Sequence, residues 1–104
     1  MNKEEEDALR GAIAGKLSGG LATMTEPVPC NDEELAAIVR DLREVSRDDV
    51  ERKLVVSGFV DHPYGDEGRR CLECMYYRVH KKWCALPAIA LPVEPEWWCR
   101  LWRI

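Results

Sequence analysis

The sequence predicts a small α+β protein, with a helical N-terminal half followed by an irregular metal-stapled module rich in cysteine and aromatic residues. All four Trp, all three Tyr, the one Phe and four of the five Cys lie beyond residue 58. Before that point, apolar residues recur at helical spacing. We therefore expect an acidic helical region over residues 1–58 and a four-cysteine metal-binding module over residues 59–104.

Helices are expected near residues 4–17, 32–45 and 47–54. The first begins with an acidic run, which suits the positive end of a helix dipole. Asn31 and Glu34 form a capping-box pattern before the apolar stripe of the second helix, and Ser46 with Asp49 repeats this pattern for the third. The β-branched stretch at residues 54–60 fits either a strand or the buried end of the third helix.

The size of the second region and the start of the chain indicate whether a disulfide or a metal stabilises that region. A module of about 45 residues seldom buries enough apolar surface to fold without a disulfide or a metal. The start of the chain is acidic and carries no secretory signal, and the longest apolar run, residues 85–93, is broken by prolines. We expect a cytoplasmic protein with no membrane segment. Thiols stay reduced in the cytoplasm, which favours a metal over a disulfide as the element that stabilises the module. Cys30 lies far from the other cysteines and has no predicted role.

Four cysteines, Cys71, Cys74, Cys84 and Cys99, are the predicted metal ligands. The Cys-x2-Cys spacing of the first two lets both sulfurs face one centre. The other two are single, so the chain is expected to wrap around the centre, which favours an iron–sulfur cluster. Aromatic rings near the cysteines would keep water from such a cluster. The predicted shielding residues are Tyr64, Tyr76, Tyr77, Trp83, Trp98 and Trp102. A short strand is expected over residues 75–79, and the chain beyond Cys84 is expected to be irregular.

Three sequence features together match a known pattern. The Cys-x2-Cys pair is followed by two tyrosines, Cys84 is followed by an apolar segment with Pro87, and the ending has an aromatic-Cys pair with a further aromatic two residues later. Over residues 62–103 the chain resembles the high-potential iron–sulfur proteins. The resemblance implies a [4Fe–4S] cluster on the four cysteines, a tyrosine (Tyr64) packed on it, and electron transfer or redox sensing with a protein partner. The loop from Cys74 to Cys84 is shorter than is usual in that family, and Trp97 replaces a glycine.

Zinc is the alternative centre. Intracellular sites of four cysteines commonly hold structural Zn²⁺, and His80 offers a ligand for a site of three cysteines and one histidine that leaves Cys99 free. The protein would then be a zinc-stabilised module that recognises a protein or a nucleic acid. We favour the cluster, with His80 as an exposed polar residue.

The charges are distributed unevenly along the chain. Residues 1–68 contain 8 Lys/Arg and 16 Asp/Glu, whereas residues 69–104 contain 7 Lys/Arg and 3 Glu. The basic end could contact nucleic acid, an acidic protein partner or the acidic half of this chain. Its basic residues are Arg69, Arg70, Arg78, Lys81, Lys82, Arg100 and Arg103. No nucleophile–base pair, Gly-rich phosphate loop or His-Glu-x2-His motif occurs, so no enzymatic activity of its own is predicted.

Overall fold

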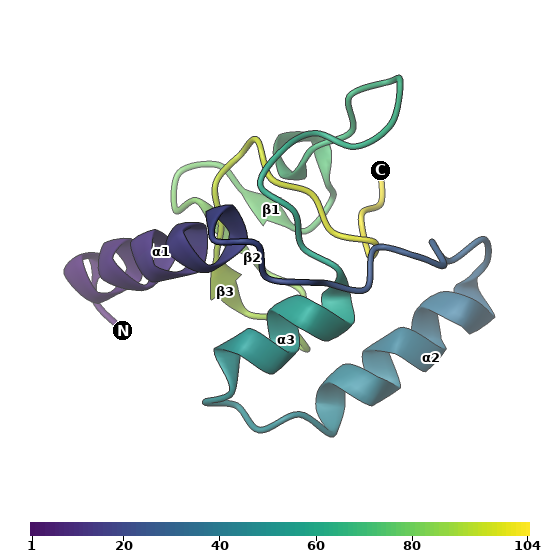
Figure 1. Cartoon of the computed structure of the whole chain (residues 1–104), viewed down its shortest axis with the longest axis horizontal. Helices are drawn as coiled ribbons and strands as arrows, with labels where there is room; N and C mark the ends of the chain where they lie inside the picture. The colour runs from purple at the N-terminus through teal and green to yellow at the C-terminus, as the bar shows by residue number, and fades with distance from the viewer.

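A computed structural model describes residues 1–104 as three helices followed by a small three-stranded antiparallel sheet (Figure 1). The helices are α1 (Lys3–Ser18), α2 (Asp32–Arg43) and α3 (Val50–Ser57). A 3-10 turn, η1 (Cys71–Glu73), precedes β1 (Tyr77–Arg78), β2 (Trp83–Cys84) and β3 (Leu91–Pro92). The predicted α+β class with a helical first half is confirmed. A metal staple in the second half stays a prediction.

Side-chain caps fix where the first two helices begin. Asn2 and Asn31 each accept a hydrogen bond from the backbone N–H three residues later, at 2.9 Å in both cases. In α2 the Glu34 carboxylate accepts from the backbone N–H of Cys30 at 2.7 Å. The predicted capping box therefore holds only in part, because Glu34 bonds the residue before the cap.

Helix α3 begins later than predicted. Asp49, and not Ser46, is the cap, because its carboxylate accepts from the backbone N–H of Arg52 at 3.1 Å. The helix ends at Gly58, which has the left-handed conformation with φ of 71° that glycine adopts without strain. Of the two interpretations of residues 54–60, the buried helix end is therefore correct as far as Ser57.

The sheet is short and places one cysteine. Its strand order is β1-β2-β3, with Tyr77 opposite Cys84 and Trp83 opposite Pro92. The strand expected within residues 75–79 is thus confirmed at two residues. Helix α1 contacts β3, and α2 packs against α3 on another side of the molecule (Figure 1).

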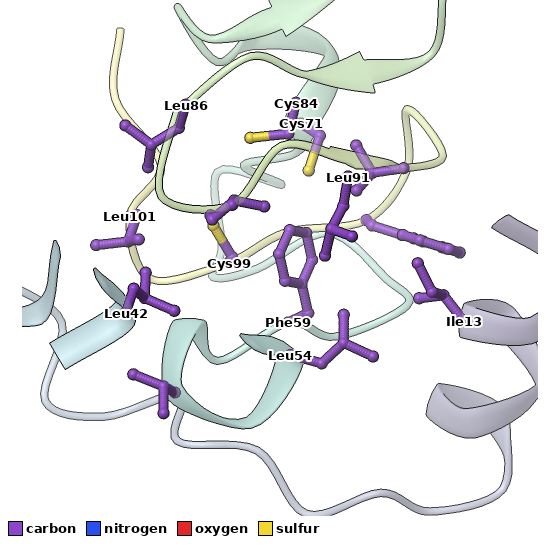
Figure 2. Close-up of a cluster of buried hydrophobic side chains, with 14 of the residues drawn as sticks. Ile13, Leu42, Leu54, Phe59, Cys71, Cys84, Leu86, Leu91, Cys99 and Leu101 are labelled. Atoms are coloured by element: carbon purple, nitrogen blue, oxygen red, sulfur yellow. The ribbon is translucent and has the colours of Figure 1, made fainter. Parts of the chain in front are cut away.

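One hydrophobic cluster of 16 buried residues joins the two halves (Figure 2). Ile13, Leu42 and Leu54 contribute from the three helices, and Cys71 and Cys84 from the second half. The segments that carry the cysteines therefore rest on the helices, which position them.

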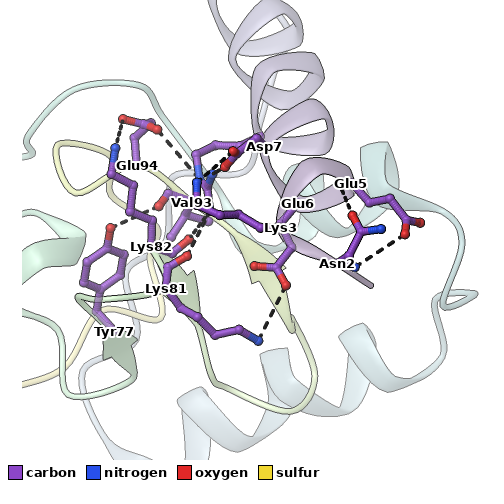
Figure 3. Close-up of polar contacts among 11 residues, drawn as sticks. Asn2, Lys3, Glu5, Glu6, Asp7, Tyr77, Lys81, Lys82, Val93 and Glu94 are labelled. Carbon is purple, nitrogen blue, oxygen red and sulfur yellow. Dashed lines mark hydrogen bonds and ion pairs between the residues drawn. The ribbon is translucent and has the colours of Figure 1, made fainter.

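Polar contacts also join the acidic half to the basic half. The Arg10 guanidinium donates from Nη2 to the backbone oxygens of Lys81 and Lys82, at 3.0 and 2.8 Å. Arg103 pairs with Asp32 at 2.9 Å. Lys81 Nζ lies 3.6 Å from a carboxylate oxygen of Glu6, an ion pair drawn in Figure 3. The basic residues Lys81 and Arg103 therefore do face acidic residues of the first half.

Candidate metal centre

The four predicted ligands, Cys71, Cys74, Cys84 and Cys99, line one cavity. Three aromatic residues, Phe59, Tyr77 and Trp102, complete its wall, so that no charged side chain lines it. Figure 2 shows three of these cysteines around the same part of the core, close to Phe59. Four residues that are spread over 29 positions of sequence therefore meet around one apolar space.

Backbone hydrogen bonds set the positions of Cys71 and Cys74. The backbone N–H of Cys71 donates to the Trp97 oxygen at 2.6 Å, which ties the start of η1 to the C-terminal segment. The N–H of Cys74 then donates to the Cys71 oxygen at 2.9 Å. This tight turn keeps the Cys-x2-Cys pair together, as its spacing predicts.

Cys99 is held by contacts on both sides of it in sequence. Trp98 and Val60 exchange two backbone hydrogen bonds, at 2.8 and 3.1 Å. On the other side, the N–H of Arg100 donates to the Ser57 oxygen at the end of α3, at 3.0 Å. The end of α3 therefore fixes the position of Cys99, while strand β2 carries Cys84.

The thiols are buried to different extents. Cys71, Cys84 and Cys99 are buried, whereas Cys74 is partly exposed. Burial raises the pKa of Cys71 and of Cys99, with the charges of the other cysteines adding to the effect, and burial raises the pKa of Cys84 to about 11. Without metal, the thiols of Cys71, Cys84 and Cys99 are therefore neutral near pH 7, and a bound metal must displace their protons.

The four cysteine side chains line the cavity without forming a ready-made metal site. No group of three or more His, Cys, Asp or Glu side chains has an arrangement that could hold a metal ion. The free space open to a water-sized molecule is about 10 Å³, which is room for about one water. The donor chemistry fits a thiolate-bound centre, but a centre larger than one ion requires the cysteine side chains to move outward.

The cavity includes an aromatic residue that sequence reasoning missed. Tyr77 and Trp102 were predicted to face the centre and do line the cavity, whereas Phe59 was not predicted to do so. Phe59 is buried directly after Gly58, where α3 ends. No signal in the local sequence identifies it, because its position depends on the close approach of Gly58 to the distant Met24 segment. Tyr77 is fixed by a hydrogen bond from its hydroxyl to the Val93 oxygen at 3.1 Å.

The other predicted shielding residues do not line the cavity. Tyr64 and Trp98 stack on each other, with ring centroids 3.9 Å apart and planes 10° from parallel. Tyr76 and Trp83 are partly exposed, and the Lys81 ammonium lies 4.8 Å from the centroid of the Trp83 ring. The structure thus places these four rings near the cysteine segments but outside the cavity wall.

His80 and Cys30 lie apart from the four cysteines. His80 is exposed and lines a separate surface groove together with residues of α1 such as Lys3 and Glu6. Cys30 is exposed on the segment before α2. Neither side chain lines the cysteine cavity.

Most of the basic residues proposed for nucleic acid already have local partners. Arg70 pairs with Glu73 at 2.6 Å and with Glu96 at 2.5 Å, and Arg69 pairs with Glu67 at 3.3 Å. Lys82 lies 3.8 Å from Glu94, and Arg100 is buried. Of the seven, Arg78 is the exposed one without an ion pair in the structure.

None of the helices has both the length and the hydrophobicity needed to cross a membrane. No family model, no curated protein and no solved structure matches this chain.

Proposed function

We propose that the four cysteines bind a [4Fe–4S] cluster and that the protein carries electrons to or from a protein partner or senses redox state. The observation that supports the proposal is the cavity itself, in which four cysteine side chains and three aromatic rings enclose one apolar space. A cytoplasmic location, where the thiols stay reduced, belongs to the same proposal.

The path of the chain and the aromatic wall favour a cluster over a single ion. In a [4Fe–4S] cluster, each of four cysteines binds through its own sulfur at the edge of a bulky centre. The four cysteines come from η1, the residue after it, β2 and the C-terminal segment, so that the chain wraps around the cavity, and three aromatic rings line it with them.

The apolar wall has a function in this proposal. When bound, such a cluster gains or loses one electron, which the partner supplies or accepts, at a potential that depends on solvent exposure. Phe59, Tyr77 and Trp102 limit the approach of water. Electrons would pass most readily on the side of Cys74, which is the one cysteine of the four that is partly exposed.

Structural zinc is the second candidate, and the small free volume favours it. About 10 Å³ accommodates about one water, which is nearer to the needs of a single ion than to those of a cluster. In that case the centre would stabilise the fold, and the protein would act by binding a protein or a nucleic acid.

Variants of the ligands distinguish these candidates. In protein purified without oxygen, we expect Cys99→Ala to lose the iron and sulfide of the wild type, because it removes one of four ligands. His80→Ala is expected to keep both, since His80 lies on a separate groove. Cys30→Ala serves as the matched control, because it removes an exposed thiol away from the cavity. Loss of metal from His80→Ala with retention in Cys99→Ala would contradict the proposal.

A further inference from the structure

A groove lies beside the connection between α2 and α3, residues 44–49 (Figure 1). It offers about 530 Å³ of free space, which falls within the range of about 300–1,000 Å³ that small-molecule sites occupy. None of its lining residues lines the cysteine cavity. The proposed metal centre therefore does not explain this groove.

Charged side chains without ion pairs line the groove. Asp41, Glu44 and Asp49 contribute three carboxylates, and Arg52 and Arg100 contribute two guanidinium groups. None of the five takes part in an ion pair of this chain. Of the three carboxylates, that of Asp49 accepts one hydrogen bond, as the cap of α3. Charges held apart around a hollow suit a ligand that carries the opposite charges.

Arg100 is the buried member of this set, with 4% of the residue exposed. Its guanidinium donates from Nε and Nη2 to the Val56 oxygen, at 3.0 and 2.7 Å, and from Nη1 to the Pro27 oxygen at 3.3 Å. These contacts use three of the five N–H groups of arginine and leave two without an acceptor in this chain. A buried N–H group without an acceptor is costly, so a ligand that supplies one is favoured.

The missing acceptor is not Asp41. Its charge opposes the lowering of the Arg100 pKa that burial causes, but the two side chains form neither an ion pair nor a hydrogen bond. The Val56 oxygen, in the last turn of α3, holds the guanidinium in place. A guanidinium in a fixed position suits a carboxylate, because its planar fork of N–H groups matches the two carboxylate oxygens.

We propose that the groove binds a basic amino acid, with its carboxylate on Arg100 and its two cationic groups among the three carboxylates. The balance of charge supports this class of ligand. The groove has three negative groups and two positive ones, whereas a basic amino acid carries one negative group and two positive ones. Met24, Val45 and Val56 also line the groove, and they would contact the methylene groups between the ligand's charges. The inference goes beyond the proposed function and does not depend on the metal at the cysteines.

Isothermal titration calorimetry of this chain with L-lysine tests the proposal. Two further probes separate the parts of the ligand: cadaverine is lysine without its carboxylate, and norleucine is lysine without its side-chain ammonium. We expect L-lysine to bind and each of the other two to bind at least about tenfold more weakly, because each leaves a charged group of the groove without a partner. Equal affinities for L-lysine and cadaverine would overturn the proposal.

Variants place the ligand in the groove. We expect the double variant Asp41→Asn/Glu44→Gln to bind L-lysine at least about tenfold more weakly than the wild type, because it removes two of the three carboxylates. Arg100→Gln is expected to bind it more weakly as well. Glu33→Gln is the matched control, because Glu33 is an exposed carboxylate of α2 outside the groove, and its affinity is expected to equal that of the wild type.

Circular dichroism first establishes that each variant is folded. If Arg100→Gln does not fold, the double variant and the comparison of L-lysine with cadaverine on the wild type decide the question. No binding of L-lysine at millimolar concentration, or unchanged affinity in the folded double variant, would overturn the inference and leave the proposed function standing. A wild-type protein that binds L-lysine but holds no iron would overturn the proposed function alone, so the two failures are distinguishable.

Discussion

Replacing Gly58 with alanine is expected to lower the free energy of unfolding by about 2–5 kcal/mol, through backbone strain and a steric clash. Gly58 has a φ of 71°, which disfavours any residue with a Cβ. A Cβ there would collide with the backbone oxygen of Met24 and lie 2.9 Å from the Met24 carbonyl carbon. The Met24 segment cannot withdraw freely, because its N–H donates to the Val55 oxygen at 2.8 Å.

The same substitution is expected to reduce metal binding, because Gly58 directly precedes Phe59, which lines the cysteine cavity. Thr23 holds Phe59 from the other side, with a hydrogen bond of 2.8 Å from its hydroxyl to the Phe59 oxygen. A shift of the chain at residue 58 therefore displaces the cavity wall.

Urea unfolding of the wild type and of Gly58→Ala measures the loss of stability. Gly11→Ala is the matched control, because Gly11 lies in the interior of α1 and a Cβ there would meet nothing within 4 Å. That control is expected to gain about 0.5–1 kcal/mol from the better helix propensity of alanine. A Gly58→Ala protein as stable as the wild type would show that the close approach of Met24 is absent.

Removing the centre is expected to lower the free energy of unfolding by about 4 kcal/mol or more, the effect of a ligand present at roughly 1,000 times its dissociation constant. The physical reason is that the bound centre would tie η1, β2 and the C-terminal segment together, whereas the metal-free state leaves four unlinked thiols. Structural thiolate centres contribute their binding free energy to folding in this way.

Urea unfolding without oxygen, before and after removal of the centre by oxidation and chelation, measures this difference. Cys99→Ala treated in the same way is the control and is expected to show no change, because it lacks one of the four proposed ligands and has no centre to lose. Equal unfolding midpoints for the loaded and the stripped wild-type protein would contradict the expected stabilisation by the centre.

Local signals made the helices predictable. The signals for α2 lie within one stretch of sequence: the cap Asn31, the acidic first turn and the apolar stripe. The helix expected near residues 32–45 therefore begins where α2 begins and extends only two residues beyond its end. The start of α3 is not fixed by local sequence, because Ser46 and Asp49 both offer a cap and the choice between them depends on how the α2–α3 connection turns.

Contacts between distant segments were not predictable. Phe59 reaches the cavity because Gly58 lets the chain pass close to Met24, and nothing in the local sequence specifies that approach. In the same way, the pairing of Val60 with Trp98 and the stacking of Tyr64 on Trp98 determine which rings miss the cavity.

The four cysteines themselves could be selected from their spacing and their aromatic surroundings, and all four do line one cavity. The identity of the centre could not be derived in the same way. It depends on how far apart the sulfurs lie and how much space they enclose, and side-chain positions set both quantities.

The central claim is tested most directly by the visible spectrum and the iron, sulfide and zinc content of wild-type protein purified without oxygen. We predict a brown protein with about four irons and four sulfides per chain, the stoichiometry of a [4Fe–4S] cluster. A colourless protein with about one zinc per chain, or one without metal, would contradict the cluster on Cys71, Cys74, Cys84 and Cys99.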